Sequence, residues 1–157
     1  MKNKSICWFV LAVSIGATEL TGLVSGLLGG AAGERYDQLV RPPLSPPGWL
    51  FPVVWTVLYA LMGIAAYRVY CDAAGARRTG ALRLYALQLG VNFLWSPVFF
   101  GLGSPALAVI LLLDVLVVLT IARFASINRC AAWLMIPYLM WILFATYLNI
   151  GILVLNG

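Results

Sequence analysis

The sequence predicts an all-α integral membrane protein, a bundle of five transmembrane helices. Of its 157 residues, 63% are hydrophobic and only 10% are charged, whereas a soluble domain carries roughly 25% charged residues. The charges fall between long apolar stretches, and a helix that crosses a membrane needs about 20 apolar residues. Segments rich in glycine and proline separate these stretches. We therefore expect a single transmembrane domain over 1–157.

The first helix is expected at 5–28. Its apolar stretch is longer than the 7–15 residues of a signal-peptide core, so we expect the helix to be retained. Gly22, Gly26 and Gly30 recur every four residues, a spacing that allows close contact between helix backbones. Glu19 is the one charged residue of this helix. We expect it to be paired or to lie near the membrane interface, and its sequence context does not decide between the two.

A proline-rich loop is expected at 31–47, and the second helix at 48–70. The stretch RPPLSPPGWLFP, residues 41–52, contains five prolines. Because each proline fixes φ near −65° and lacks an N–H donor, we predict a stiff lid over one end of the bundle. The alternative is a plain rigid connector. Pro52 falls in the first turn of the second helix, where a missing N–H costs little.

Three further helices complete the predicted bundle, at 80–100, 105–124 and 131–154. The segment GLGSP at 101–105 separates the first two, because its glycines and proline end one helix and begin the next. Five crossings place the two termini on opposite sides. The side with the N-terminus carries eight basic residues and the other side two. Because positive charge marks the cytoplasmic side of an inner membrane, we predict a cytoplasmic N-terminus if the protein lies in an inner membrane.

The residue types also exclude several classes of function. No basic run interleaves with aromatic residues as nucleic-acid binding requires, so we expect no nucleic-acid partner. The chain has no histidine, which removes the commonest haem and zinc ligand and any Ser-His-Asp triad. Cys7, Cys71 and Cys130 lack the close spacing of metal ligands. We therefore expect no metal and no cofactor, and we interpret the cysteines as small packing residues.

Aromatic and polar residues share faces of three predicted helices. The three sets, each at helical spacing, are Trp55 and Tyr59; Gln88, Asn92, Trp95 and Phe99; and Tyr138, Trp141, Ala145 and Asn149. Ligand pockets are apolar and aromatic with a few placed polar groups, so these faces predict a cavity. The alternative is that the polar groups only join helices. Asp114 remains open between a pocket wall and a structural pair. Trp8, Trp49 and Trp133 lie near predicted helix ends and are expected to anchor the membrane interface.

The stretch from 36 to 63 resembles the translocator protein family, also called the tryptophan-rich sensory protein or peripheral benzodiazepine receptor family. The residues that carry the resemblance are Tyr36, Leu39, Arg41, Pro42, Pro46, Pro47, Pro52, Trp55, Tyr59, Met62 and Gly63. It continues in order through QLGVNFLWSPVFF (88–100), ALAVILLLD (106–114) and IPYLMWILFATYLN (136–149). Arg41 stands where the family usually has lysine, which keeps the charge, and Arg35 stands where an aromatic residue often occurs.

The resemblance implies a bacterial-type member of this family, located in the inner or outer membrane of the cell envelope. It also implies a ligand cavity beneath the first loop. Its implied partners are protoporphyrin IX-like tetrapyrroles or isoquinoline- and benzodiazepine-type ligands, membrane lipid, and a second copy of the chain in a homodimer. The segment IGILVLNG after Asn149 lacks the Tyr and Lys or Arg of a sterol-recognition pattern. The expected ligand-binding residues are Tyr36, Arg41, Pro46, Phe51, Trp55, Tyr59, Gln88, Asn92, Trp95, Asp114, Tyr138, Trp141 and Ala145.

Three functions remain in competition at this point. We favour a porphyrin sensor or scavenger. The first alternative is an enzyme that degrades porphyrin with light and oxygen, in which Trp55 and Trp141 would be the catalytic residues because indoles can be oxidised. The second alternative is a transporter of porphyrin or of small hydrophobic molecules, although the sequence has no obvious repeat and no pair of broken helices.

Overall fold

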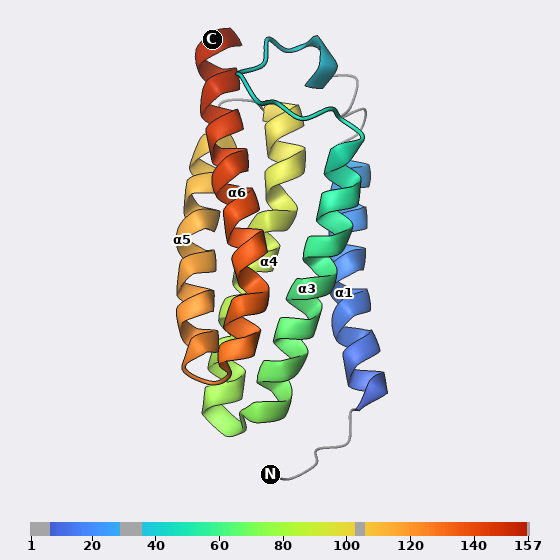
Figure 1. Ribbon diagram of the computed structural model, residues 1–157, viewed down its shortest axis with the longest axis vertical. Helices are drawn as coiled ribbons and strands as arrows, with labels where there is room; N and C mark the ends of the chain where they lie inside the picture. Colours follow the sequence, from blue (N-terminus) through green and yellow to red (C-terminus); the bar gives the residue numbers. More distant parts are fainter. Residues whose placement is uncertain (1–6, 29–35, 103–105, 157) are drawn as a thin grey trace.

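The computed structural model describes residues 7–28, 36–102 and 106–156. Within these residues the chain forms long helices and a short helical turn at 36–38, with no strand. The long helices are α1 (Trp8–Leu28), α3 (Leu50–Asp72), α4 (Gly75–Leu102), α5 (Ala106–Ala125) and α6 (Arg129–Asn156). Successive helices run in opposite directions, so the start of α1 and the end of α6 lie at opposite ends of the bundle (Figure 1).

The helices close into a ring in the order α1, α3, α6, α5, α4, and each contacts its two neighbours. Gly63 of α3 allows the backbones of α1 and α3 to approach closely. A Cβ atom added to Gly63 would stand 2.6 Å from the Cα of Ile15. Small residues allow helices in membranes to approach in this way. Ser14 adds a hydrogen bond at the same place, from its Oγ to the carbonyl oxygen of Gly63 at 2.7 Å.

Among the described residues, four helices are long and apolar enough to cross a membrane: α1, α3, α5 and α6. Helix α4 differs because arginines occupy its first turns and because Gln88 and Asn92 interrupt its apolar part. Both amides are buried inside the bundle, so they lower the hydropathy of α4 without facing lipid. Four of the predicted transmembrane helices therefore have the length and hydropathy of a membrane span, and the crossing by α4 remains a prediction.

The helix bounds differ most from expectation at the start of α4, which begins at Gly75 instead of residue 80. The expectation placed the helix start where the apolar stretch begins. Arginine and alanine are good helix formers, so the helix extends beyond that stretch through Arg77 and Arg78. Gly75 has a φ of +53°, a conformation that glycine adopts at little cost, and it reverses the chain between α3 and α4.

One half of the bundle, near the connections at 73–74 and 126–128, is closely packed, and we call it the packed half. Five of its side chains have no exposed surface: Val69, Ala81, Phe124, Ala131 and Met135. The connections are tied by hydrogen bonds. Asn128 binds Asp72 and accepts a bond from the amide of Ala131 at 2.9 Å, while Arg77 donates to the carbonyl of Ser126 at 2.8 Å.

At the other end, residues 36–49 cross the bundle, and we call them the lid segment (Figure 1). The side chain of Asn156 holds the backbone of Val40 from both sides, accepting from its amide at 3.0 Å and donating to its carbonyl at 2.8 Å. Tyr147 donates to the carbonyl of Pro43 at 2.9 Å. Pro42 lies so close to Gly151 that a Cβ there would stand 2.6 Å from it. The C-terminal part of α6 therefore holds the lid segment in place.

Tryptophans mark both ends of the bundle on its outer surface. Trp8 opens α1, Trp49 precedes α3 and Trp133 lies near the start of α6, and each is exposed. This placement agrees with the expected anchors at the two membrane interfaces. Cys7 and Cys130, expected to be packing residues, are instead exposed.

Candidate ligand-binding cavity

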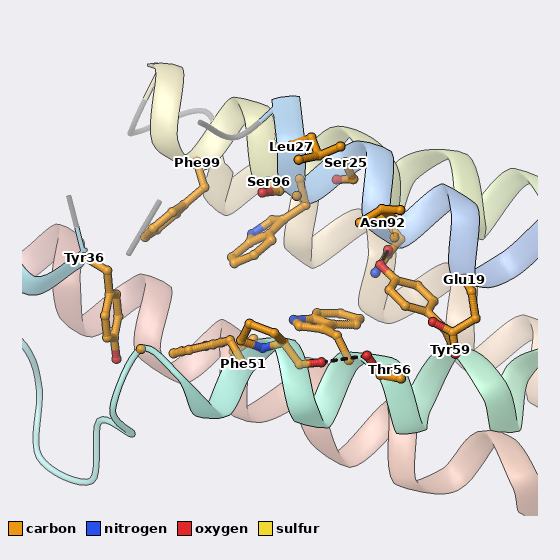
Figure 2. A pocket seen from close by; sticks show the side chains of 18 of the residues that line it. Glu19, Ser25, Leu27, Tyr36, Phe51, Thr56, Tyr59, Asn92, Ser96 and Phe99 are labelled. Atoms are coloured by element: carbon orange, nitrogen blue, oxygen red, sulfur yellow. Dashed lines mark hydrogen bonds between the residues drawn. The ribbon is translucent and has the colours of Figure 1, made fainter. Parts of the chain in front are cut away.

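A cavity of about 780 Å³ lies between α1, α3, α4 and α6, beneath the lid segment (Figure 2). We call this part of the bundle the cavity half. The volume falls within the range of roughly 300–1,000 Å³ that is usual for small-molecule sites. Most of the lining is leucine, glycine and aromatic carbon. The cavity therefore suits a largely apolar ligand.

Two stacked aromatic pairs face the cavity. Trp55 and Tyr59 of α3 stack with ring centroids 5.2 Å apart and planes inclined by 26°. Trp95 and Phe99 of α4 stack in the same way, at 5.2 Å and 20°. Both pairs are four residues apart, so each lies along one face of its helix. Aromatic faces of this kind can stack on a flat conjugated ligand.

The lid end of the cavity is also aromatic. Tyr36 of the lid segment meets Phe51 of α3 edge to face, with ring centroids 5.2 Å apart. Tyr36 is buried, and its hydroxyl donates to the carbonyl of Pro46 at 3.3 Å. The guanidinium group of Arg41 lies over the Tyr36 ring, with its carbon atom 5.2 Å from the ring centroid. A cation thus stands just behind the lid end of the cavity.

The deep end of the cavity rests on a chain of side-chain hydrogen bonds. Tyr59 donates to Asn92 Oδ1 at 2.6 Å, and Asn92 Nδ2 donates to the Tyr138 hydroxyl at 3.1 Å. Tyr138 in turn donates to Gln88 Oε1 at 3.0 Å. These four buried residues join α3, α4 and α6. They form a polar layer between the cavity half and the packed half.

Helix α1 forms the remaining wall. It is held by hydroxyl groups: Ser25 Oγ donates to the carbonyl of Phe93 at 2.7 Å, and Thr18 shares a hydrogen bond with Tyr85 at 2.9 Å. Gly22 lies directly against the ring of Tyr59, and a Cβ atom there would overlap that ring. Of the three regularly spaced glycines, Gly22 therefore allows a contact with an aromatic ring. At Gly26, nothing lies within 4 Å of an added Cβ atom. Gly30 is outside the described residues.

A model of the TspO/MBR family matches residues 9–155 of the chain. The chain belongs to the TspO/MBR family. It is 40% identical to "Tryptophan-rich protein TspO" of Chlorobaculum tepidum over 98% of this chain and 99% of that protein. It is 43% identical to "Tryptophan-rich sensory protein" of Cereibacter sphaeroides over 78% of this chain and 77% of that protein. It is 35% identical to "Translocator protein" of Homo sapiens over 90% and 83%.

With its apolar helices, membership of the TspO/MBR family makes the chain an integral, multi-pass membrane protein. The translocator resemblance read from the stretch around the prolines is thereby confirmed. The sequence also predicted a set of site residues for this family member. Seven of them line the cavity: Tyr36, Phe51, Trp55, Tyr59, Asn92, Trp95 and Ala145.

Five of the other predicted site residues lie around the cavity without lining it. Gln88 and Tyr138 belong to the polar layer below it. Trp141 lies behind Phe51, whose ring it meets edge to face at 5.8 Å between centroids. Pro46 and Arg41 support Tyr36 from the lid segment. These five residues therefore lie next to the cavity and outside its lining.

Asp114 lies apart from the cavity. It borders a small separate groove with Val115, Val118 and Leu119. Its Oδ2 accepts a hydrogen bond from Thr146 Oγ1 at 2.8 Å, which joins α5 to α6. Of the two readings that the sequence left open, structural pairing is the one that this geometry favours.

The sequence reasoning did not anticipate the contribution of α1. Glu19, expected to be paired or near an interface, instead lines the deep part of the cavity beside Tyr59 (Figure 2). Further lining residues absent from the predicted set include Leu23, Ser25, Ser96, Phe99, Leu148, Asn149 and Ile152. Phe99 and Asn149 were visible as members of helical faces. Leu23 and Ile152 gave no signal, because they resemble any apolar residue of a membrane helix.

Proposed function

We propose that the protein binds a tetrapyrrole of the protoporphyrin IX type in this cavity and acts as a porphyrin sensor or scavenger. The observation that carries the proposal is the pair of aromatic stacks, Trp55–Tyr59 and Trp95–Phe99, on the walls of an apolar cavity of about 780 Å³. A flat macrocycle exposes two large apolar faces, and its burial there removes both from water or lipid headgroups. Offset stacking adds roughly 0.5–1.5 kcal/mol for each ring pair.

The polar edge of such a ligand has a partner at the lid end. Arg41 stands behind Tyr36, and its side chain is about one third exposed. Its only ion pair in the described part of the chain is a 3.5 Å contact with the exposed Asp37. An exposed pair of this kind contributes little, so a ligand carboxylate can take the place of Asp37 at small cost. Guanidinium and carboxylate form strong charge-assisted hydrogen bonds.

We also propose that α4 makes the fifth crossing and that the packed half faces the cytoplasm. The side chains that support this orientation are basic and gather at the packed end: Arg68, Arg77, Arg78, Arg83, Arg123 and Arg129. Arg41 is the basic residue of the lid segment, and Asp37 offsets it. The positive-inside rule then places the lid segment on the opposite side of an inner membrane.

Titration of the purified protein with protoporphyrin IX in darkness tests the function. We expect saturable binding, seen as quenching of tryptophan fluorescence and a shift of the porphyrin absorption band. Trp55→Leu removes one stacking face and should weaken binding about tenfold, equivalent to 1.4 kcal/mol. Trp133→Leu is the matched control, because Trp133 is 71% exposed and lies outside the cavity. Absence of saturable binding, or equal losses in the two variants, would rule the proposal out.

Light-dependent breakdown of the bound porphyrin is the second candidate, because the oxidisable indoles of Trp55 and Trp95 face the ligand space. Trp141, the other residue expected to take part, does not line that space, and its ring contacts Phe51, which does. Illumination of the complex in the presence of oxygen distinguishes the two candidates. Loss of the absorption band in light but not in darkness, abolished by Trp55→Phe, would support the enzyme.

A further inference from the structure

The cavity has a single ionisable acid in its described lining. Of the residues that face it, Glu19 alone is an Asp, Glu, Lys or Arg. The described residues give its carboxylate neither an ion pair nor a hydrogen bond. A carboxylate at membrane depth without a partner is costly. Such a residue calls for an explanation beyond packing, and none of its contacts with the described residues supplies one.

The position of Glu19 is fixed by its neighbours on α1. Thr18, the preceding residue, is buried and hydrogen-bonded to Tyr85 of α4. Ser14 binds the carbonyl of Gly63 on α3, and Ser25 binds that of Phe93 on α4. These bonds set the rotation of α1 about its axis. Glu19 consequently lies at the deep part of the cavity, close to Tyr59 (Figure 2).

The cavity is therefore polarised along its length. Its deep part has the carboxylate of Glu19, and its lid end has Tyr36 with Arg41 behind it. Figure 2 shows Glu19 and Tyr36 at opposite ends of the space between the helices. Coulomb interactions are stronger in apolar surroundings than in bulk water. A ligand carboxylate is thus attracted at the lid end and repelled at the deep end.

We propose that Glu19 determines specificity by orienting the ligand: carboxylates along one edge of the macrocycle point to the lid segment, and macrocycles with carboxylates on the opposite edge are rejected. The inference rests on the proposed porphyrin binding. The favoured ligand class is a dicarboxylate tetrapyrrole with both acids on one side and an apolar opposite edge. Rejection by like charge is an efficient route to specificity, because it disfavours the wrong ligand without any new contact to the right one.

Three probes test this: protoporphyrin IX, with two propionates on one edge; coproporphyrin III, with a propionate on every pyrrole ring; and the uncharged dimethyl ester of protoporphyrin IX. Each is titrated in darkness against the full chain in one detergent at neutral pH. We expect wild type to prefer protoporphyrin IX to coproporphyrin III. Glu19→Gln should reduce that preference about tenfold, mainly by tightening coproporphyrin III. Binding of the dimethyl ester should change less than threefold.

Two variants serve as matched controls. Glu19→Asp keeps the charge at the same place and should keep the wild-type preference. Asp114→Asn removes a carboxylate from membrane depth outside the cavity and should also keep it. If the preference for protoporphyrin IX over coproporphyrin III is unchanged in Glu19→Gln, or changes equally in Asp114→Asn, then Glu19 does not determine specificity. The proposed binding of protoporphyrin IX is unaffected by that result. Weaker protoporphyrin IX binding in Glu19→Gln also overturns the role of Glu19, because Glu19 then attracts the ligand. If none of the three probes binds to wild type, the proposed function fails as well.

Discussion

The packed half and the cavity half are built from the same helices and from similarly apolar sequence. Yet the packed half has closely packed side chains, whereas the cavity half contains a cavity of about 780 Å³. In the packed half, small residues such as Ala65 and Ala131 let the helices approach, and Phe124 and Met135 fill the space between them. In the cavity half, the aromatic rings stack on the residue four positions along their own helix. Rings that lie along their own helix leave the centre open.

The polar layer of Tyr59, Asn92, Tyr138 and Gln88 marks the boundary between the two halves. Its hydrogen bonds hold three helices at a fixed separation, since a buried polar group left without a partner is expensive. We infer that packing in the packed half sets the positions of the helices. The polar layer then keeps α3, α4 and α6 at those positions next to the cavity. Changes in the packed half should therefore cost stability, whereas changes around the lid segment should alter ligand exchange.

The largest effect is expected from Gly63→Val in the α1–α3 contact. Even a Cβ atom at this position would come within 2.6 Å of the Ile15 backbone, so α1 must move away from α3. Overpacking of this kind costs about 3 kcal/mol at the upper end of its usual range. Thermal unfolding in detergent should show a clearly lower Tm and loss of porphyrin binding, because α1 forms one wall of the cavity.

Gly90→Ala is the control for that experiment. Nothing lies within 4 Å of a Cβ atom at Gly90, and alanine is the better helix former by about 1 kcal/mol. Its Tm should equal or exceed that of wild type. Equal destabilisation by the two variants would show that close packing of α1 on α3 does not set the stability of the bundle.

A smaller effect is expected from Tyr138→Phe in the polar layer. The change removes one hydroxyl from a fully buried ring, and it leaves Gln88 Oε1 and Asn92 Nδ2 without their partner. Unsatisfied buried groups cost about 1–3 kcal/mol, although helices in membranes often find alternative partners. Unfolding in detergent should show a loss near 1 kcal/mol. A Tm equal to wild type would mean that the layer is not a structural boundary.

The smallest effect is expected from Asn156→Ala, which releases the backbone of Val40 in the lid segment. The two bonds are exposed, so water can replace them, and their loss should leave the Tm nearly unchanged. Porphyrin dissociation, followed by stopped-flow fluorescence, should become several-fold faster. Tyr147→Phe removes a separate lid contact, to Pro43, and should act in the same direction. Unaltered dissociation in both variants would show that the lid segment does not gate the cavity.

Much of this architecture can be predicted from the sequence, because long apolar stretches interrupted by charges and prolines leave few alternatives in a membrane. The faces with Trp55 and Tyr59, and with Asn92 and Trp95, were predicted as cavity residues from helical spacing alone, and they do line a cavity. Spacing reports the face of a helix on which a residue lies. It does not report how far along the axis a cavity extends, so Tyr138 and Trp141 share the correct face but lie outside the lining.

The role of α1 could not be predicted for a different reason. In a membrane both sides of a helix can be apolar, so its amphipathic pattern does not identify the inward face. Only Thr18 and Ser25 are buried in α1, and hydroxyl residues are common in such helices. Glu19 was conspicuous in the sequence, but its surroundings depend on the positions of α3 and α4. Those positions come from contacts distant in the chain, such as that between Thr18 and Tyr85.

Helix α1 has only two buried residues, Thr18 and Ser25, and this has a consequence for assembly. The cavity is complete only when α1 has packed against α3 and α4, because α1 forms one of its walls. If the proposed ligand binds there, it adds RT ln(1 + [L]/Kd) to the free energy that favours the assembled bundle, or about 2.7 kcal/mol at a hundredfold excess over Kd. On that proposal, the amount of fully assembled protein in the membrane is expected to rise with the amount of ligand present during assembly.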